Sequence, residues 1–206
     1  MNHSYNILTD LSAEYPMLFE SEEHDMDTYA VELNSFVDTV LTKVYDLGTG
    51  RNMIFSSFNP DICLLLSFKQ PSIPILFLSD AGTSPVGDIR ASSLQEAIRF
   101  SSRWNLLGVV SAAEPLVTCP RLIRVVKESG LVCVSYGTLN NNPAMVARQA
   151  KEGIDAVIVD SVLAIRKELT AAQQKAGEQG PGPIIEVPQV VPTANGRNGV
   201  KVNGHA

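Results

Sequence analysis

One complete strand–helix–strand unit occupies residues 107–136, which read LGVVSAAEPLVTCPRLIRVVKESGLVCVSY. Its two strands are the short apolar runs LGVV (107–110) and LVCV (131–134). Both runs are continuous rather than alternating, which is typical of strands that are buried on both faces by helices. The helix between them begins near Pro120 and ends at Gly130, a residue that readily adopts the left-handed backbone of a helix terminus. This stretch therefore predicts a parallel βαβ unit with a right-handed crossover.

The same pattern repeats on both sides of this unit. Further strand-like runs are NIL (6–8), which is weaker than the others, MIF (53–55), ILFL (75–78) and AVIV (156–159). Helices are expected to begin at Asn59-Pro60 and Asn142-Pro143, because asparagine caps a helix and proline suits its first turn. The segment SLQE (93–96) has the pattern of a capping box. The repetition predicts about six strand-then-helix units of a parallel α/β fold, with the sheet either open and doubly wound or part of a barrel.

The two ends of the chain differ from this regular stretch. Residues 26–47 carry apolar side chains at helical spacing, which predicts an amphipathic helix. From residue 170 onward the sequence holds Gly-Pro-Gly-Pro at 180–183 and no Phe, Trp or Tyr. Such a segment buries too little apolar surface to offset its ordering entropy. We therefore expect one domain followed by a disordered tail over 170–206.

Composition limits the classes of partner. The chain has 206 residues, a formal net charge of −6 and a pI near 5.1, so it has no broad basic surface for nucleic acid or an anionic membrane. No secretory signal opens the sequence, and its apolar runs are too short for a membrane span, so we expect a cytoplasmic protein. Cys63, Cys119 and Cys133 sit among apolar residues and are interpreted as buried, reduced thiols.

Polar residues follow the predicted strands, at the end where parallel α/β folds bind their ligands. These strand exits read SSFN (56–59), SD (79–80), SAAE (111–114), SYGTLN (135–140) and DS (160–161). Ser, Asn and Asp also favour such positions as helix caps and turn residues. Glu114, Tyr136 and Asn140 are larger than a cap requires, although Glu114 before Pro115 and a packed Tyr136 also have structural interpretations.

The sequence lacks the short motifs that identify an enzyme class by themselves. It has no Walker loop, zinc-spaced Cys/His set, nucleophile elbow or glycine-rich dinucleotide turn. His3, His24 and His205 do not follow predicted strands, so we do not expect imidazole acid–base catalysis within this chain. The acidic segment ESEEHD (20–25) is interpreted as a solvated loop rather than a cation site.

The strand exits nevertheless resemble those of one enzyme family. The similarity is carried by FSSFNPDIC (55–63), KQP (69–71), PILFL (74–78), RASSLQEAIRF (90–100), SAAEPL (111–116) and DAVIVD (155–160). These segments resemble glycerophosphodiester phosphodiesterases, which are (β/α)8 barrels, and most closely the C-terminal part of the catalytic domain of fungal glycerophosphocholine phosphodiesterases. The resemblance implies an incomplete (β/α)8 TIM barrel over 15–169 with about six C-terminal βα units, preceded by an unmatched segment 1–14 and followed by the tail 170–206.

For the intact family domain, the resemblance implies hydrolysis of glycerophosphocholine to choline and glycerol 3-phosphate, with a divalent cation (Mg²⁺ or Ca²⁺) and two histidines. The family's His-Arg-Gly strand, Glu-x-Asp pair and second histidine lie upstream of the matched region. Its Glu-x-Lys-Tyr-Pro segment, aligned on Tyr15-Pro16, places Ser12 at the metal-binding glutamate and Glu14 at the phosphate-binding lysine. We therefore expect no catalytic residue, no metal ligand and no cofactor in this chain, and Ser57, Glu114, Tyr136 and Asn140 as lining of the substrate end.

Three hypotheses follow. The first is the C-terminal part of a phosphodiesterase domain, truncated and inactive alone, which would act on a small-molecule glycerophosphodiester if completed. The second is a degenerate barrel that serves as a regulatory or binding module in phosphate signalling. The third is a hydrolase assembled from two chains. A barrel without its first two strands has open edges, so self-association is also expected.

Overall fold

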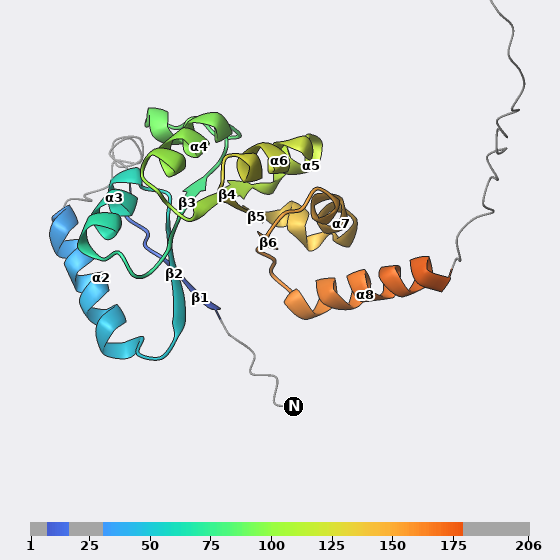
Figure 1. Ribbon diagram of the computed structural model, residues 1–206, viewed down its shortest axis with the longest axis horizontal. Helices are drawn as coiled ribbons and strands as arrows, with labels where there is room; N and C mark the ends of the chain where they lie inside the picture. Colours follow the sequence, from blue (N-terminus) through green and yellow to red (C-terminus); the bar gives the residue numbers. More distant parts are fainter. Residues whose placement is uncertain (1–7, 17–30, 179–206) are drawn as a thin grey trace, which may run out of the picture. The chain divides into compact units, whose positions relative to one another are not determined.

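The computed structural model describes residues 8–16 and 31–178, and these contain one parallel sheet of six strands in the order β1-β2-β3-β4-β5-β6 (Figure 1). The strands are β1 (Leu8–Ser12), β2 (Asn52–Ser57), β3 (Ile75–Ser79), β4 (Gly108–Ala112), β5 (Val132–Tyr136) and β6 (Ala156–Val157). Each strand pairs with the next one along the chain. A doubly wound sheet reverses its strand order, whereas this sheet does not. The fold is therefore the predicted incomplete β/α barrel.

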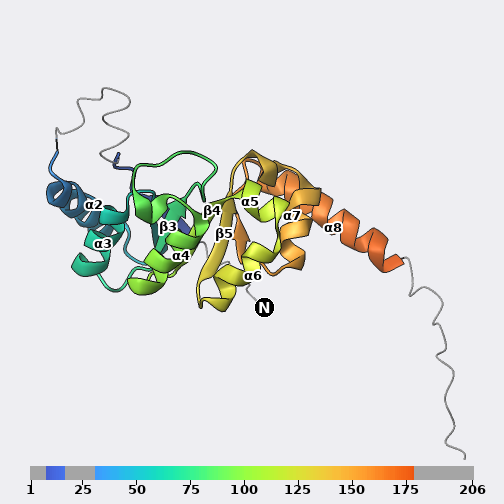
Figure 2. The same cartoon turned by 90° about the horizontal axis from the view of Figure 1, so that it is seen from above.

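The helices follow the strands and cover the outer face of the sheet (Figures 1 and 2). They are α2 (Leu33–Leu47), α3 (Pro60–Lys69), α4 (Leu94–Arg103), α5 (Ala113–Thr118), α6 (Arg121–Glu128), α7 (Pro143–Lys151) and α8 (Val162–Glu178), with short 3₁₀ helices η1 (Ile89–Ala91) and η2 (Thr138–Asn141). None of the described helices has the length and apolar content that crossing a membrane would require.

The predicted helix starts are confirmed. The Asn59 side chain accepts from the Asp61 N–H at 2.9 Å, the Asn142 side chain accepts from the Ala144 N–H at 2.9 Å, and Ser93 Oγ accepts from the Glu96 N–H at 3.2 Å. Each cap satisfies an amide that has no partner inside its helix. Helix α2 begins at Leu33, and residues 26–30 of the expected helix lie outside the described residues.

Apolar residues lie on both faces of the sheet. The expectation of helices on both faces is wrong, because the inner-face cluster contains strand and loop residues but no helix residue. On the outer face Phe55, Phe77 and Val109 pack with the helices. On the inner face Leu78, Val110 and Val134 stand in register on neighbouring strands and form a second, smaller cluster. Strands β4 and β5 approach so closely at Gly108 that an added Cβ would lie 2.0 Å from the Val132 carbonyl oxygen.

The cysteines correct one expectation. Cys63 and Cys133 are buried free thiols, and burial raises the pKa of each to about 12. Cys119 is exposed, because the chain breaks between α5 and α6 at Cys119-Pro120 and turns this side chain outward. The single helix expected to begin near Pro120 is therefore preceded by a separate helix, α5.

The boundaries of the domain also differ from those expected. The first strand is Leu8–Ser12 rather than a run centred on residues 6–8, and residues 1–7 lie outside the described residues. At the other end, α8 continues to Glu178, beyond the expected limit at Leu169. The expectation of disorder over 179–206 falls outside the described residues. The described residues up to Thr170 form one compact unit, which holds the whole sheet.

Candidate functional site

A small pocket lies at the carboxyl ends of β3, β4 and β5. Its volume is about 240 Å³, and it is lined by Asp80, Thr83, Ala112, Ala113, Glu114, Tyr136, Gly137, Thr138 and Leu139. Asp80 directly follows β3, Glu114 lies in the first turn of α5 after β4, and Tyr136 ends β5. Because parallel strands end at the same edge, residues far apart in sequence meet at this pocket.

Tyr136 is the most constrained side chain of the pocket. Its hydroxyl donates a hydrogen bond to Asp80 Oδ1. Its ring packs edge-to-face against Phe58, with ring centroids 5.8 Å apart and an interplanar angle of 83°. Partial burial and the hydrogen bond to the Asp80 carboxylate raise the pKa of Tyr136 above its ordinary value, so the phenol remains neutral at physiological pH.

Asp80 reaches Tyr136 because other groups close the turn after β3. Ser79 Oγ accepts from the Ala81 N–H at 3.0 Å, and Ala81 adopts a left-handed φ of 55°. The Asp80 side chain is therefore not needed as a cap. The sequence places Asp80 at a strand exit but gives no sign that it lines the site, because its partner Tyr136 is 56 residues away.

Of the four side chains expected to line the substrate end, Glu114 and Tyr136 meet at this pocket. Glu114 is exposed and lies in the first turn of α5, which begins at Ala113. It therefore lines the pocket while remaining accessible to solvent.

Ser57 and Asn140 have other partners and do not line the pocket. Ser57 Oγ donates to the Ala13 carbonyl at 2.7 Å and accepts from the Asn59 N–H at 3.1 Å, which ties the β1 exit to β2. Asn140 is completely buried. Its Nδ2 donates to the Ile158 carbonyl at 3.1 Å, and its Oδ1 accepts from Gln149 Nε2 at 2.8 Å. Asn140 thus joins η2 to α7 and to the end of β6.

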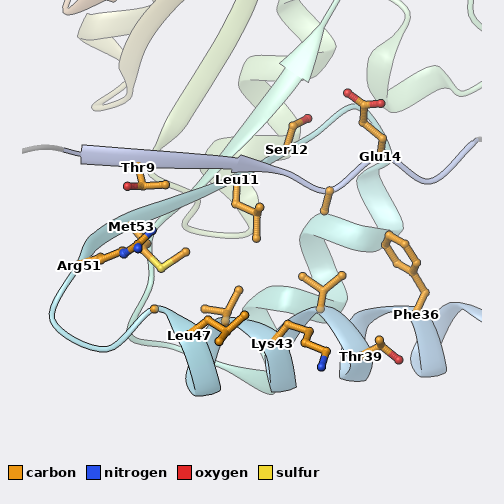
Figure 3. A pocket seen from close by; sticks show the side chains of 14 residues that line it. Thr9, Leu11, Ser12, Glu14, Phe36, Thr39, Lys43, Leu47, Arg51 and Met53 are labelled. Atoms are coloured by element: carbon orange, nitrogen blue, oxygen red, sulfur yellow. The ribbon is translucent and has the colours of Figure 1, made fainter.

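Ser12 and Glu14, which the family resemblance aligns with a metal-binding glutamate and a phosphate-binding lysine, lie at the exit of β1. They line a different cavity of about 590 Å³ between β1 and α2. Figure 3 shows Leu11 pointing toward α2, whereas Ser12 and Glu14 point away from it. Ser12 is in register with Ser56 of β2, so the position expected to carry a carboxylate faces a second hydroxyl group.

The described residues do not fit a divalent cation. Within 8–16 and 31–178, no group of three or more His, Cys, Asp and Glu side chains is placed to hold a metal ion. The pocket has only two carboxylates, Asp80 and Glu114, among its lining residues. Asp80 Oδ1 already accepts a hydrogen bond from the Tyr136 hydroxyl. Mg²⁺ and Ca²⁺ need about six oxygen ligands, so we derive no chemical step through a metal in this chain.

Comparison with known proteins identifies the family. The model of the glycerophosphoryl diester phosphodiesterase family matches residues 5–164. The chain belongs to this family. The family match begins ahead of Tyr15 and includes β1, so it extends into the segment 1–14 that the sequence analysis left unmatched.

Relatives within the family include fungal and plant phosphodiesterases. A glycerophosphocholine phosphodiesterase of Eremothecium gossypii is 58% identical over 171 residues, which cover 83% of this chain and 13% of that protein. The glycerophosphocholine phosphodiesterase of Candida albicans is 56% identical over 174 residues, 84% of this chain and 15% of the relative. A chloroplastic glycerophosphodiester phosphodiesterase of Arabidopsis thaliana is 41% identical, covering 65% of this chain and 36% of that one. The chain thus spans about one seventh of the length of the two fungal relatives.

Solved structures of the family share the fold. A structure from Parabacteroides distasonis, described as a glycerophosphodiester phosphodiesterase, matches with a TM-score of 0.55 at 13% identity, over 81% of this chain and 58% of that one. A protein from Silicibacter pomeroyi assigned to the same activity gives a TM-score of 0.57 at 19% identity, over 74% and 48% of the two chains. At these identities the comparison establishes the barrel architecture alone.

Proposed function

We propose that this chain is the C-terminal part of a glycerophosphodiester phosphodiesterase catalytic domain and that it provides substrate-binding surface rather than catalytic groups. The family reaction is the hydrolysis of glycerophosphocholine to choline and glycerol 3-phosphate. The observation that carries the proposal is the family match over residues 5–164, on a sheet whose carboxyl end holds the pocket of Asp80, Glu114 and Tyr136. The names of the fungal relatives, glycerophosphocholine phosphodiesterases at 56% and 58% identity, support this choice of substrate.

We further propose that the 206 residues do not hydrolyse this substrate by themselves. Three features support inactivity. Ser12 and Glu14 stand at the motif positions of a metal ligand and a phosphate contact. The described residues hold no group of three metal-binding side chains. The same residues form six strands, whereas a complete barrel of this kind has eight.

The test is choline release by the purified 206-residue chain from glycerophosphocholine, with Mg²⁺ or Ca²⁺ added. The full-length Eremothecium gossypii relative serves as the positive control under the same conditions. We expect no release above the rate of the buffer blank. Turnover that disappears on chelation and returns with metal would show that the chain is an enzyme and would refute the proposal of inactivity.

A regulatory or binding module remains the second candidate, because the β3–β5 pocket is formed although the metal ligands are not. It predicts saturable binding of glycerophosphocholine to a chain that does not turn it over. For either role the proposed location is the cytoplasm, because the thiols of Cys63 and Cys133 are free and the cytoplasm keeps thiols reduced.

We also propose self-association through the open edges of the sheet. Strand β1 has a neighbour on one side only among the described strands, and so does β6. Beside β1 the cavity of about 590 Å³ is lined mainly by apolar side chains, among them Leu11, Phe36 and Leu47 (Figure 3). An unpaired strand edge next to an apolar surface favours association with a second copy.

A further inference from the structure

We propose that the pocket formed by Asp80, Glu114 and Tyr136 binds a quaternary ammonium group, so that it holds the cationic end of a choline-containing substrate. The inference rests on the proposed function, because it names which part of a glycerophosphodiester this pocket takes. It assigns a ligand chemistry to two carboxylates and one aromatic ring, all three of which attract positive charge.

The charge of the pocket selects against the phosphate end of the substrate. Two carboxylates line it, and no Lys, Arg or His is among its lining residues. The guanidinium of Arg90, in η1 after β3, is paired with other carboxylates, at 2.6 Å from Asp61 and 2.5 Å from Asp88. An anion entering the pocket would meet two like charges without a compensating cation, whereas a cation would be attracted by both.

The ring of Tyr136, which is the aromatic side chain among the lining residues, provides the surface that a methylated ammonium group needs. Such a group carries a positive charge but has no N–H to donate, so aromatic faces and carboxylates recognise it better than hydrogen-bond acceptors alone. The hydroxyl bond to Asp80 and the edge-to-face packing on Phe58 fix the orientation of the Tyr136 ring before a ligand arrives. Leu139 and Ala112 complete the wall with apolar atoms that suit methyl groups.

The size of the pocket also favours a head group over a whole substrate. Its volume of about 240 Å³ lies below the roughly 300–1,000 Å³ of sites that enclose drug-sized ligands. A trimethylammonium group with its short alkyl arm is a compact ligand. The phosphate and glycerol would extend out of the pocket, along the carboxyl edge of the sheet where barrels carry out their chemistry.

The experiment is a ligand-observed NMR titration of the full 206-residue chain, whose folding is checked by circular dichroism. Three probes are compared: choline, its neutral carbon isostere 3,3-dimethylbutan-1-ol, and glycerol 3-phosphate. We expect choline to bind, the neutral isostere to bind at least about tenfold more weakly, and glycerol 3-phosphate not to compete for this pocket. Absence of choline binding by the folded chain, or equal binding of the neutral isostere, would overturn the inference.

Variants locate the site. Glu114→Gln removes a charge from an exposed side chain and is expected to weaken choline binding about threefold to tenfold, while Glu128→Gln on α6 is the matched control and should leave it unchanged. Tyr136→Phe retains the ring and should bind choline more tightly than Tyr136→Leu, which removes it. Equal binding by Glu114→Gln and Glu128→Gln would refute the assignment. The titration measures binding and does not depend on turnover. Absence of choline binding therefore refutes only the choline pocket, whereas choline release from glycerophosphocholine by the chain refutes only the proposed inactivity.

Discussion

The centre of the sheet and its β1 edge differ in how their polar residues are used. At the exits of β3, β4 and β5, polar side chains contact one another across strands, as Tyr136 and Asp80 do. At the exit of β1, Ser12 and Glu14 are the residues that the family resemblance aligns with a catalytic motif, and the neighbouring cavity is mostly apolar. Among the described residues they belong to no group of three metal-binding side chains. The comparison shows that polar strand exits of one sheet can contact one another across strands at its centre, whereas those at its β1 edge lie beside an apolar cavity.

The largest expected effect of a single substitution is at the close contact between β4 and β5. In Gly108→Val the side chain would collide with the Val132 backbone, since even a Cβ would lie 2.0 Å from its carbonyl oxygen. We expect a loss of more than about 4 kcal/mol in the free energy of unfolding, which in a marginally stable domain prevents folding. Soluble expression and urea denaturation would measure it.

A contrasting substitution is Gly50→Ala, in the turn between α2 and β2. This glycine has a φ of +78° but no heavy atom within 4 Å of an added Cβ. Its expected cost is about 1 kcal/mol, from backbone strain alone. A larger loss of unfolding free energy for Gly50→Ala than for Gly108→Val would contradict the tight packing of β4 against β5 at Gly108.

A smaller effect is expected from the polar network behind the pocket. Asn140→Ala removes the bonds to the Ile158 carbonyl and Gln149 and leaves buried polar groups without partners. We expect a loss of about 2–4 kcal/mol in the free energy of unfolding by urea denaturation. Asn141→Ala, an exposed neighbour that bonds Asp160, should lose no more than about 1 kcal/mol. Similar losses for the two variants would mean that burial of Asn140 adds nothing.

At the β1 edge, a substitution should alter association more than stability. Leu47 lines the apolar cavity and is 72% exposed, so Leu47→Glu should weaken self-association by about tenfold or more while changing the free energy of unfolding by less than about 0.5 kcal/mol. Sedimentation velocity over a concentration series measures this. Ile89→Glu, at a position 73% exposed outside the cavity, is the control. A wild-type chain that stays monomeric throughout the series would refute association through this edge.

The smallest effect concerns pH and the link between β5 and β6. Partial burial opposes ionisation of Asp155, but hydrogen bonds from the Cys133 N–H at 2.9 Å and from Lys127 outweigh it and lower the pKa of Asp155. A carboxyl with a lowered folded-state pKa stabilises the fold above its unfolded pKa of about 3.9, and this stabilisation is lost as pH falls through the folded value. Urea denaturation should therefore show a smaller loss between about pH 6 and pH 3 for Asp155→Asn than for wild type. An identical loss in both would exclude this carboxyl as a contributor.

Local signals in the sequence predicted much of the fold. The asparagine-proline and Ser93 caps formed as expected because a cap depends on residues two or three positions away. The continuous apolar runs predicted the strands, because an apolar run is also a local signal. The strand order, which distinguishes a barrel from a doubly wound sheet, required either the family resemblance or the structure.

The candidate site was less predictable because it depends on long-range contacts. Side-chain size grouped Asn140 with Tyr136, although Asn140 is completely buried and Tyr136 lines the pocket. No local pattern links Asp80 to Tyr136. Cys119 is exposed because it lies between two helices, α5 and α6. The sequence predicted only one helix start in this region, near Pro120.

The most direct test of the central claim is a pair of chimeras of the Eremothecium gossypii relative. In the first, residues 15–169 of this chain replace the matching segment; in the second, residues 1–169 do so and bring Ser12 and Glu14 into the motif positions. Choline release from glycerophosphocholine is measured for both, after each is shown to be folded. We predict release by the first chimera at a rate comparable to the parent and none by the second. A folded but inactive first chimera, or an active second one, would contradict the account.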